Sequence, residues 1–203
     1  LELYEAIFET KYLRHAINLS KQMLKHFWDK QNGGFFQTAD DSEVLITRRK
    51  DAHDGAIPSG NSIALLNLIR IARITGDTIF EKTAEDLVRE FTTEIEYMPS
   101  IYTMFLSSLD YLLGPSCEIV IAGNMKSNDT VEMMRTIRKI FLPNKVIILR
   151  PHDDAPSDIY DIVPFCQSQK SLDGKATAYV CQNHTCSTPT TEVGELRRNL
   201  TTS

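Results

Sequence analysis

The segment from residue 62 to residue 74 constrains the fold most, because its spacing predicts a helix that is apolar on almost every side. Only Asn67, Arg70 and Arg73 interrupt its apolar side chains. A helix with so little polar surface is buried on most sides in a folded protein. Other elements of the chain must therefore surround residues 62–74.

Two further segments, residues 12–27 and 79–97, predict helices with a single apolar face. Their apolar positions match at a constant offset, so that Tyr12 corresponds to Phe80 and Phe27 to Ile95. A second mostly apolar helix is predicted over residues 100–113. The alternation and the repeat predict antiparallel helical hairpins, with an amphipathic outer layer over a buried inner layer. The inner side chains that we expect to be buried are Ile63, Leu66, Ile69, Phe105 and Leu109.

The pattern changes at Gly114-Pro115, where short β-branched runs begin to alternate with helices. Strands are predicted over residues 117–122 and 145–149, joined by a helix over 130–142, which makes a parallel, right-handed βαβ unit. A third strand over 177–181 and a last helix that ends near Leu200 complete this part. We therefore predict a mainly α fold with an α/β end, with helical hairpins in residues 1–114 and a small parallel sheet in residues 115–203.

Charge and composition exclude several classes of function. The chain has 27 acidic and 22 basic side chains, a net charge of −5, which argues against a nucleic-acid or anionic-membrane surface. No apolar run approaches the roughly 18 residues of a transmembrane helix, and no signal peptide is visible. We expect a cytoplasmic protein with no nucleic-acid or membrane partner. Because the sequence begins at Leu1 inside a predicted helix, we also expect a fragment or a processed chain.

The four cysteines indicate neither a disulfide scaffold nor a metal site. Cys117 and Cys166 lie in apolar contexts, and Cys181 and Cys186 form a C-x4-C pair that is neither a redox C-x-x-C motif nor a zinc knuckle. Reduced structural thiols are the expected state. No metal and no cofactor are predicted, since the glycine-rich nucleotide motifs are also absent.

The densest polar segment runs from residue 27 to residue 62, between the first outer helix and the first buried helix. Its Asn32-Gly33-Gly34 turn leads into an extended stretch, for which Val44-Leu45-Ile46 is a candidate return strand. We expect its polar groups to converge on the start of the buried helix, where a polar or anionic ligand can bind. The candidate catalytic residues are Asp51 and Asp54. The candidate ligand-binding residues are Trp28, Phe35, Arg48, His53, Ser59 and Asn61, with the aromatic rings as a wall for a sugar. The alternative is that Asp54, Ser59 and Asn61 only cap the helix and tie down the loop.

Several motifs resemble one known family. They are Trp28-Asp29-x3-Gly33-Gly34-Phe35-Phe36, Asp51-x2-Asp54-Gly55-Ala56-x-Pro58-Ser59-Gly60-Asn61-Ser62, Leu142-Pro143-Asn144-Lys145-Val146, and Lys175 to Cys181 followed by x4-Cys186 and Pro189. Over almost the whole chain this pattern resembles the C-terminal third of the spermatogenesis-associated protein 20 family, whose bacterial and archaeal members are thioredoxin-domain-containing proteins of unassigned function.

The resemblance implies a protein of three parts: an N-terminal thioredoxin-like domain, an α/α toroid and a small α/β end. The toroid would be like that of N-acylglucosamine 2-epimerases and six-hairpin glycosidases. Only part of this toroid and the α/β end would lie in this chain, so the missing regions are its expected partners. Two hypotheses follow. The chain binds or processes a small-molecule sugar, or it is a non-catalytic scaffold for the thioredoxin-like domain; whether it is an enzyme is left open.

Overall fold

The computed structural model describes residues 1–43, 46–152, 157–182 and 185–201. Its internal contacts divide the chain into two compact units. The first comprises Leu1, Lys11–Ala72 and Asp77–Gly114, and the second comprises Glu2–Thr10, Arg73–Gly76 and the chain from Pro115 onward. The mainly α fold with an α/β end is confirmed.

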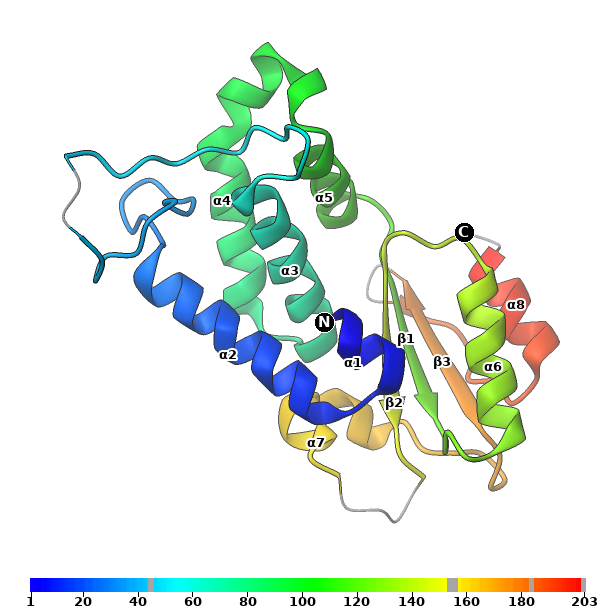
Figure 1. Ribbon diagram of the computed structural model, residues 1–203. Helices are drawn as coiled ribbons and strands as arrows, with labels where there is room; N and C mark the ends of the chain where they lie inside the picture. Colours follow the sequence, from blue (N-terminus) through cyan, green and yellow to red (C-terminus); the bar gives the residue numbers. More distant parts are fainter. Residues whose placement is uncertain (44–45, 153–156, 183–184, 202–203) are drawn as a thin grey trace. The chain divides into compact units, whose positions relative to one another are not determined.

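Among the described residues of the first unit, the regular elements are helices. Its helices are α2 (Thr10–His26), α3 (Gly60–Thr75), α4 (Thr78–Tyr97), the short 3-10 helix η1 (Pro99–Ile101) and α5 (Thr103–Leu113). Figure 1 shows α3 between α2 and α4, with α5 beside them. The core of the unit is formed mainly by α3 and α4, with Phe105 and Tyr111 of α5, and α2 adds side chains that are only partly buried.

Burial follows the sequence prediction for α3 and α5 only in part. Ile69 and Phe105 are at most 1% exposed, as predicted. The prediction is wrong for Ile63, which is 39% exposed, while Leu66 and Leu109 are half-buried. The packed neighbours of α3 leave a strip of its surface uncovered, so an apolar side chain on every face does not place every face in the core.

The two repeated helices also differ in burial. In α4, the side chains at the repeat positions are all buried, from Phe80 to Ile95. In α2, the corresponding positions are half-buried or exposed, and Leu19 is 65% exposed. The matching patterns therefore specify two amphipathic helices, of which α4 is packed against the core of this unit far more fully.

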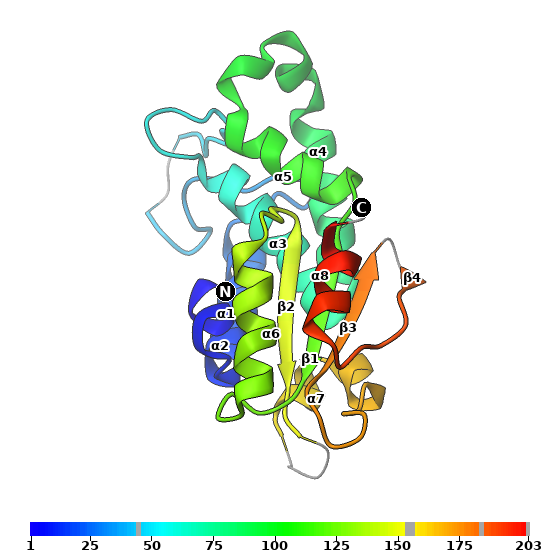
Figure 2. The same cartoon turned by 90° about the vertical axis from the view of Figure 1, so that its right-hand side faces the viewer.

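The second unit contains a four-stranded sheet with helices around it. Its strands are β1 (Cys117–Ala122), β2 (Lys145–Arg150), β3 (Thr177–Gln182) and β4 (Thr185–Cys186), in the order β2-β1-β3-β4. Its helices are α1 (Glu2–Ile7), α6 (Asn128–Lys139), α7 (Ile159–Ile162), the 3-10 helix η2 (Pro164–Ser168) and α8 (Val193–Thr201). Figure 2 shows α6 and α8 on one face of the sheet, and their apolar side chains share a core with Ile119, Ile121 and Val180.

The sheet is mixed, which corrects the prediction of a parallel sheet. Strands β1 and β2 are parallel neighbours, as predicted, with Ile119 opposite Ile147. Strand β3 runs antiparallel to β1, and β4 runs antiparallel to β3. After β2, the chain passes through α7 and η2 before β3, so no single crossover helix of the βαβ kind imposes a parallel direction on β3.

The expectation of reduced thiols at the C-x4-C pair is wrong, because Cys181 and Cys186 form a disulfide. The physical reason is the register of β3 and β4, which places these residues directly opposite each other. Cys117 and Cys166 are free and buried. Among the residues that the structure describes, no helix is long and apolar enough to cross a membrane.

Candidate functional site

The polar segment between α2 and α3 begins with a tight turn that Asp29 organises. Its carboxylate accepts hydrogen bonds from the backbone N–H groups of Gln31 and Asn32, at 2.9 and 3.3 Å. Gly33 and Gly34 both have positive φ, at 86° and 78°, a conformation that side chains disfavour. The turn brings Phe35 back beside Trp28, and their rings pack edge to face with centroids 4.9 Å apart.

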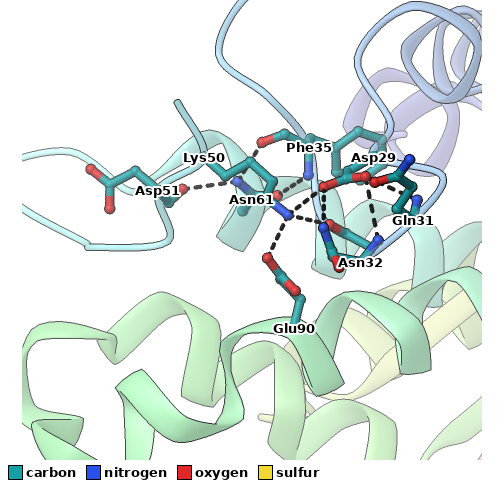
Figure 3. A network of polar contacts seen from close by, with 9 residues as sticks. Asp29, Gln31, Asn32, Phe35, Lys50, Asp51, Asn61 and Glu90 are labelled. Atoms are coloured by element: carbon teal, nitrogen blue, oxygen red, sulfur yellow. Dashed lines mark hydrogen bonds and ion pairs between the residues drawn. The ribbon is translucent and has the colours of Figure 1, made fainter. Parts of the chain in front are cut away.

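Lys50 fixes this turn to the neighbouring helix (Figure 3). Its ammonium group donates to Asp29 Oδ2 at 2.7 Å, to the backbone carbonyl of Gly33 at 2.9 Å, and to the Glu90 carboxylate on α4. Burial by itself raises the pKa of Asp29, but hydrogen bonds from Lys50, Gln31 and Asn32 outweigh it and hold that pKa well below the ordinary value. Burial likewise opposes the charge of Lys50, yet the two carboxylates raise its pKa.

Asn61, near the start of α3, holds the extended stretch by its side-chain amide. Its Oδ1 accepts from the Phe35 N–H at 2.8 Å, and its Nδ2 donates to the Phe35 carbonyl at 2.9 Å. The same Nδ2 also donates to the Asp51 carbonyl at 2.9 Å. Asn61 is 3% exposed. Its amide therefore satisfies the buried backbone N–H and C=O groups of Phe35, as a neighbouring strand would do in a sheet.

Asp54 acts as a remote cap. Its Oδ2 accepts from the N–H groups of Met104 and Phe105 in the first turn of α5, at 2.8 and 3.0 Å, and its Oδ1 accepts from Ser59 at 2.8 Å. Ser59 in turn caps α3, since its hydroxyl accepts from the N–H of Ser62 at 3.0 Å. These two predicted site residues therefore carry the capping role that the sequence left as an alternative.

A pocket of about 660 Å³ opens beside these caps, within the first unit. Of the predicted site residues, Phe35, Asp51, His53, Ser59 and Asn61 line it. Trp28, Arg48 and Asp54 do not. Further lining residues that the sequence reasoning did not select as site residues are Met23, Phe27, Phe36, Gln37, Ile57, Pro58 and Gly60.

Asp51 and His53 are the pocket-lining side chains that can exchange a proton. One carboxylate oxygen of Asp51 accepts from the backbone N–H of His53 at 2.8 Å, and within the described part of the chain the other oxygen has no hydrogen-bond donor. Figure 3 shows this carboxylate pointing away from the Lys50 network. The His53 ring lies edge to face with that of Tyr102, with centroids 6.4 Å apart.

Arg48 has a supporting position outside the pocket. Its guanidinium donates to the backbone carbonyls of Thr38 and His26, and it lies 4.2 Å from the ring centroid of Phe36. This contact places the cation against a ring that lines the pocket. Val44 and Leu45 of the predicted return strand lie outside the described residues. Among the described residues, Lys50 forms an isolated antiparallel β-bridge with Phe36.

The sequence reasoning did not find the partners of Lys50. Asp29 lies within the Trp28-Asp29-x3-Gly33-Gly34 motif, and this is the signal that could have identified it, whereas Glu90 looks like an ordinary polar position on an amphipathic helix. The structure also places His26, Asp40 and Asp41 together, with one ligand-type atom from each within 4.8 Å of the others. Hydrogen bonding to His26 lowers the pKa of Asp40.

Fold and pocket together define a mainly α protein with an α/β end and a cavity of ligand size in its helical unit. No protein-family model matches the chain. It is 35% identical to human spermatogenesis-associated protein 20 and 33% identical to the mouse protein, over 98% of its own length. It is also 27% identical, over 97% of its length, to an uncharacterised protein of Caenorhabditis elegans.

The chain spans about a quarter of the length of these curated relatives. It is therefore homologous to part of spermatogenesis-associated protein 20, and the resemblance that its motifs indicated is confirmed.

Proposed function

We propose that the pocket of the helical unit binds a small carbohydrate or a similarly polyhydroxylated molecule. The observation that carries the proposal is the combination of aromatic rings from Phe27, Phe35 and Phe36 with the polar groups of Asp51 and His53 in one cavity. A volume of about 660 Å³ lies within the range of small-molecule sites, which are mostly apolar with a few polar groups that orient the ligand.

The polar groups of the pocket suit hydroxyl groups. The free oxygen of Asp51 accepts a hydrogen bond, and the side chains of Gln37 and Ser59 offer donors as well as acceptors. The rings present apolar faces to the carbon skeleton of a sugar. The same pocket would favour a neutral ligand over an anion, because Asp51 contributes a negative charge at its lining.

Binding has more support than hydrolysis. Glycoside hydrolysis requires two carboxyl groups on opposite sides of the scissile bond. Asp54, the second candidate, accepts three backbone hydrogen bonds and does not line the pocket. Any processing of a bound sugar would therefore rest on Asp51 and His53.

Isothermal titration with a panel of monosaccharides and disaccharides tests the proposal. Asp51→Asn keeps an oxygen for the His53 N–H but removes the charge, so we expect binding to weaken about ten-fold or more. Glu85→Gln, an exposed change on α4, removes the same charge away from the pocket and should leave affinity unchanged. Equal affinities in these two variants, or no binding by the parent chain, would contradict the proposal.

The second candidate function is a non-catalytic scaffold for the thioredoxin-like domain of a longer protein. The observation that favours it is that polar side chains of the segment, Lys50, Asp54 and Asn61 among them, hold backbone groups in place. Both candidate functions include two further proposals. The helices form part of a toroid in the longer chain, and the protein is cytoplasmic. Association of the separately produced thioredoxin-like domain with this chain, unaffected by Asp51→Asn, would support the scaffold.

A further inference from the structure

The disulfide between Cys181 and Cys186 lies at the open edge of the sheet in the second unit. Strand β4 is the last strand of the order β2-β1-β3-β4, and Figure 2 shows it at the outer side of β3. Cys186 is exposed and Cys181 is half-buried. A thiol in solution can therefore approach the disulfide from the side of Cys186.

The hairpin beside the disulfide has its own backbone hydrogen bonds. The N–H of Ser187 donates to the Val180 carbonyl at 2.9 Å. Ala178 and Thr190 exchange two backbone hydrogen bonds, of 2.8 and 3.1 Å. The disulfide closes a ring between residues only five positions apart, so it adds little to strand pairing that these bonds already maintain. Opening the disulfide should leave the sheet in place.

The free thiols of the described chain are not placed to open this disulfide from within. In the register of β1 with β3, Cys181 is opposite Glu118, whereas Cys117 is opposite Gln182. Because successive side chains of a strand point to opposite faces, Cys117 and Cys181 lie on different faces of the sheet. Cys117 is 5% exposed and Cys166 fully buried, and burial raises the pKa of each thiol to about 11. Both stay protonated and therefore poor nucleophiles at neutral pH.

We propose that Cys181–Cys186 is a site of thiol–disulfide exchange whose reaction partner is an external dithiol. A thiolate of the dithiol attacks Sγ of the exposed Cys186, the S–S bond breaks, and Sγ of Cys181 leaves as a thiolate that takes up a proton. The second thiol of the dithiol then loses its proton and attacks the mixed disulfide, which releases the Cys186 thiolate. Two electrons pass from the dithiol, which becomes a disulfide, to the cysteine pair, which becomes two thiols.

Differential alkylation of the unmodified chain tests the proposal. The native protein is incubated with dithiothreitol, then alkylated with N-ethylmaleimide, and the labelled peptides are measured by mass spectrometry. We expect Cys181 and Cys186 to be labelled together, at least about ten-fold more than Cys117 and Cys166, with the circular dichroism spectrum unchanged. The proposal is overturned if the pair resists reduction until a denaturant is added. It is also overturned if both cysteines are alkylated before dithiothreitol is present.

Two single variants test which of the two cysteine sulfurs is the more accessible to a reaction partner in solution. Cys181→Ser leaves Cys186 as a free thiol, and Cys186→Ser leaves Cys181. With an aromatic disulfide reagent, the thiol of Cys186 should react about ten-fold faster than that of Cys181, because it is the more exposed. Equal rates, or a faster reaction at Cys181, would overturn the assignment of Cys186. Should either variant fold poorly, alkylation of the unmodified chain still decides the main proposal.

Discussion

Replacing Asp54 with alanine should destabilise the helical unit, because this one carboxylate serves two helix starts. The residue before α5, Tyr102, provides no side-chain cap of its own. Asp54 supplies the missing acceptor from fifty positions away, with bonds of 2.8 and 3.0 Å to Met104 and Phe105. Its other oxygen accepts from Ser59 at 2.8 Å, next to the first turn of α3. Asp54→Ala leaves all three N–H groups without this partner.

The expected loss follows from measured capping energies. Replacing an N-cap by alanine costs about 1 kcal/mol per helix, and Asp54 affects two helix starts, so the free energy of unfolding should fall by about 2 kcal/mol. For a chain of this size, 1 kcal/mol lowers the melting temperature by about 2–4 °C. The expected decrease is therefore about 4–8 °C. Asp54→Asn keeps one oxygen as an acceptor and should lose about half as much.

Thermal unfolding followed by circular dichroism measures this effect, with Asp77→Ala as the benchmark. Asp77 is the N-cap of α4, and its carboxylate accepts from the backbone N–H of Ile79 at 2.9 Å. Asp54→Ala should lower the melting temperature clearly more than Asp77→Ala does. An Asp54→Ala chain that melts within about 1 °C of the parent would refute the capping argument. A folded Asp54→Ala chain that has lost ligand binding would instead restore Asp54 as a site residue.

Three further predictions concern the turn that Lys50 holds. Lys50→Met leaves two carboxylates without their shared cation and should cost about 3 kcal/mol in urea unfolding, against less than about 1 kcal/mol for Arg89→Met at an exposed pair. Because the pKa of Asp29 is lowered in the folded state, its stabilisation is complete above the ordinary carboxyl pKa of about 4 and is lost as the pH falls through the folded-state pKa. Asp29→Asn should therefore flatten the loss of stability below about pH 4, measured by urea unfolding at several pH values. Gly33→Ala should lower the free energy of unfolding by about 2 kcal/mol in the same assay, because φ is 86° and the new Cβ would lie 2.9 Å from a backbone carbonyl oxygen of α4. Gly55→Ala is the control, since a Cβ there would meet no atom within 4 Å, and it should cost nothing measurable.

The sequence predicts those features of the fold that depend on local spacing. The one-faced pattern of residues 79–97 corresponds to α4, and the strands at 117–122 and 145–149 are parallel because a helix joins them. The direction of β3 could not be read in this way, because the described residues between β2 and β3 form only short helical segments. The disulfide was missed for a related reason. Strand β4 is two residues long, too short to have a pattern, and without it the spacing of Cys181 and Cys186 does not show that they are opposite each other.

The candidate site shows the same limit. The motif around residues 51–62 marks where the helix begins and which residues cap it, and both follow from local rules. The contacts of Asp54 with α5 and of Lys50 with Glu90 join positions 40 or more residues apart. Such contacts arise from helix packing, so no spacing in the sequence distinguishes these side chains from solvated ones.

The hydrogen bonds of the pocket determine how its function can be tested. Asn61 binds both backbone groups of Phe35, so Asn61→Ala would free the aromatic wall as well as remove an amide from the lining. A loss of binding after that change would report the displacement of the wall as much as any contact with a ligand. Asp51→Asn does not have this ambiguity, because the backbone carbonyl of residue 51 still receives the Asn61 amide and the side-chain oxygen still receives the His53 N–H. A change in affinity at Asp51 with an unchanged melting temperature would therefore identify the carboxylate charge itself as the group that the ligand contacts.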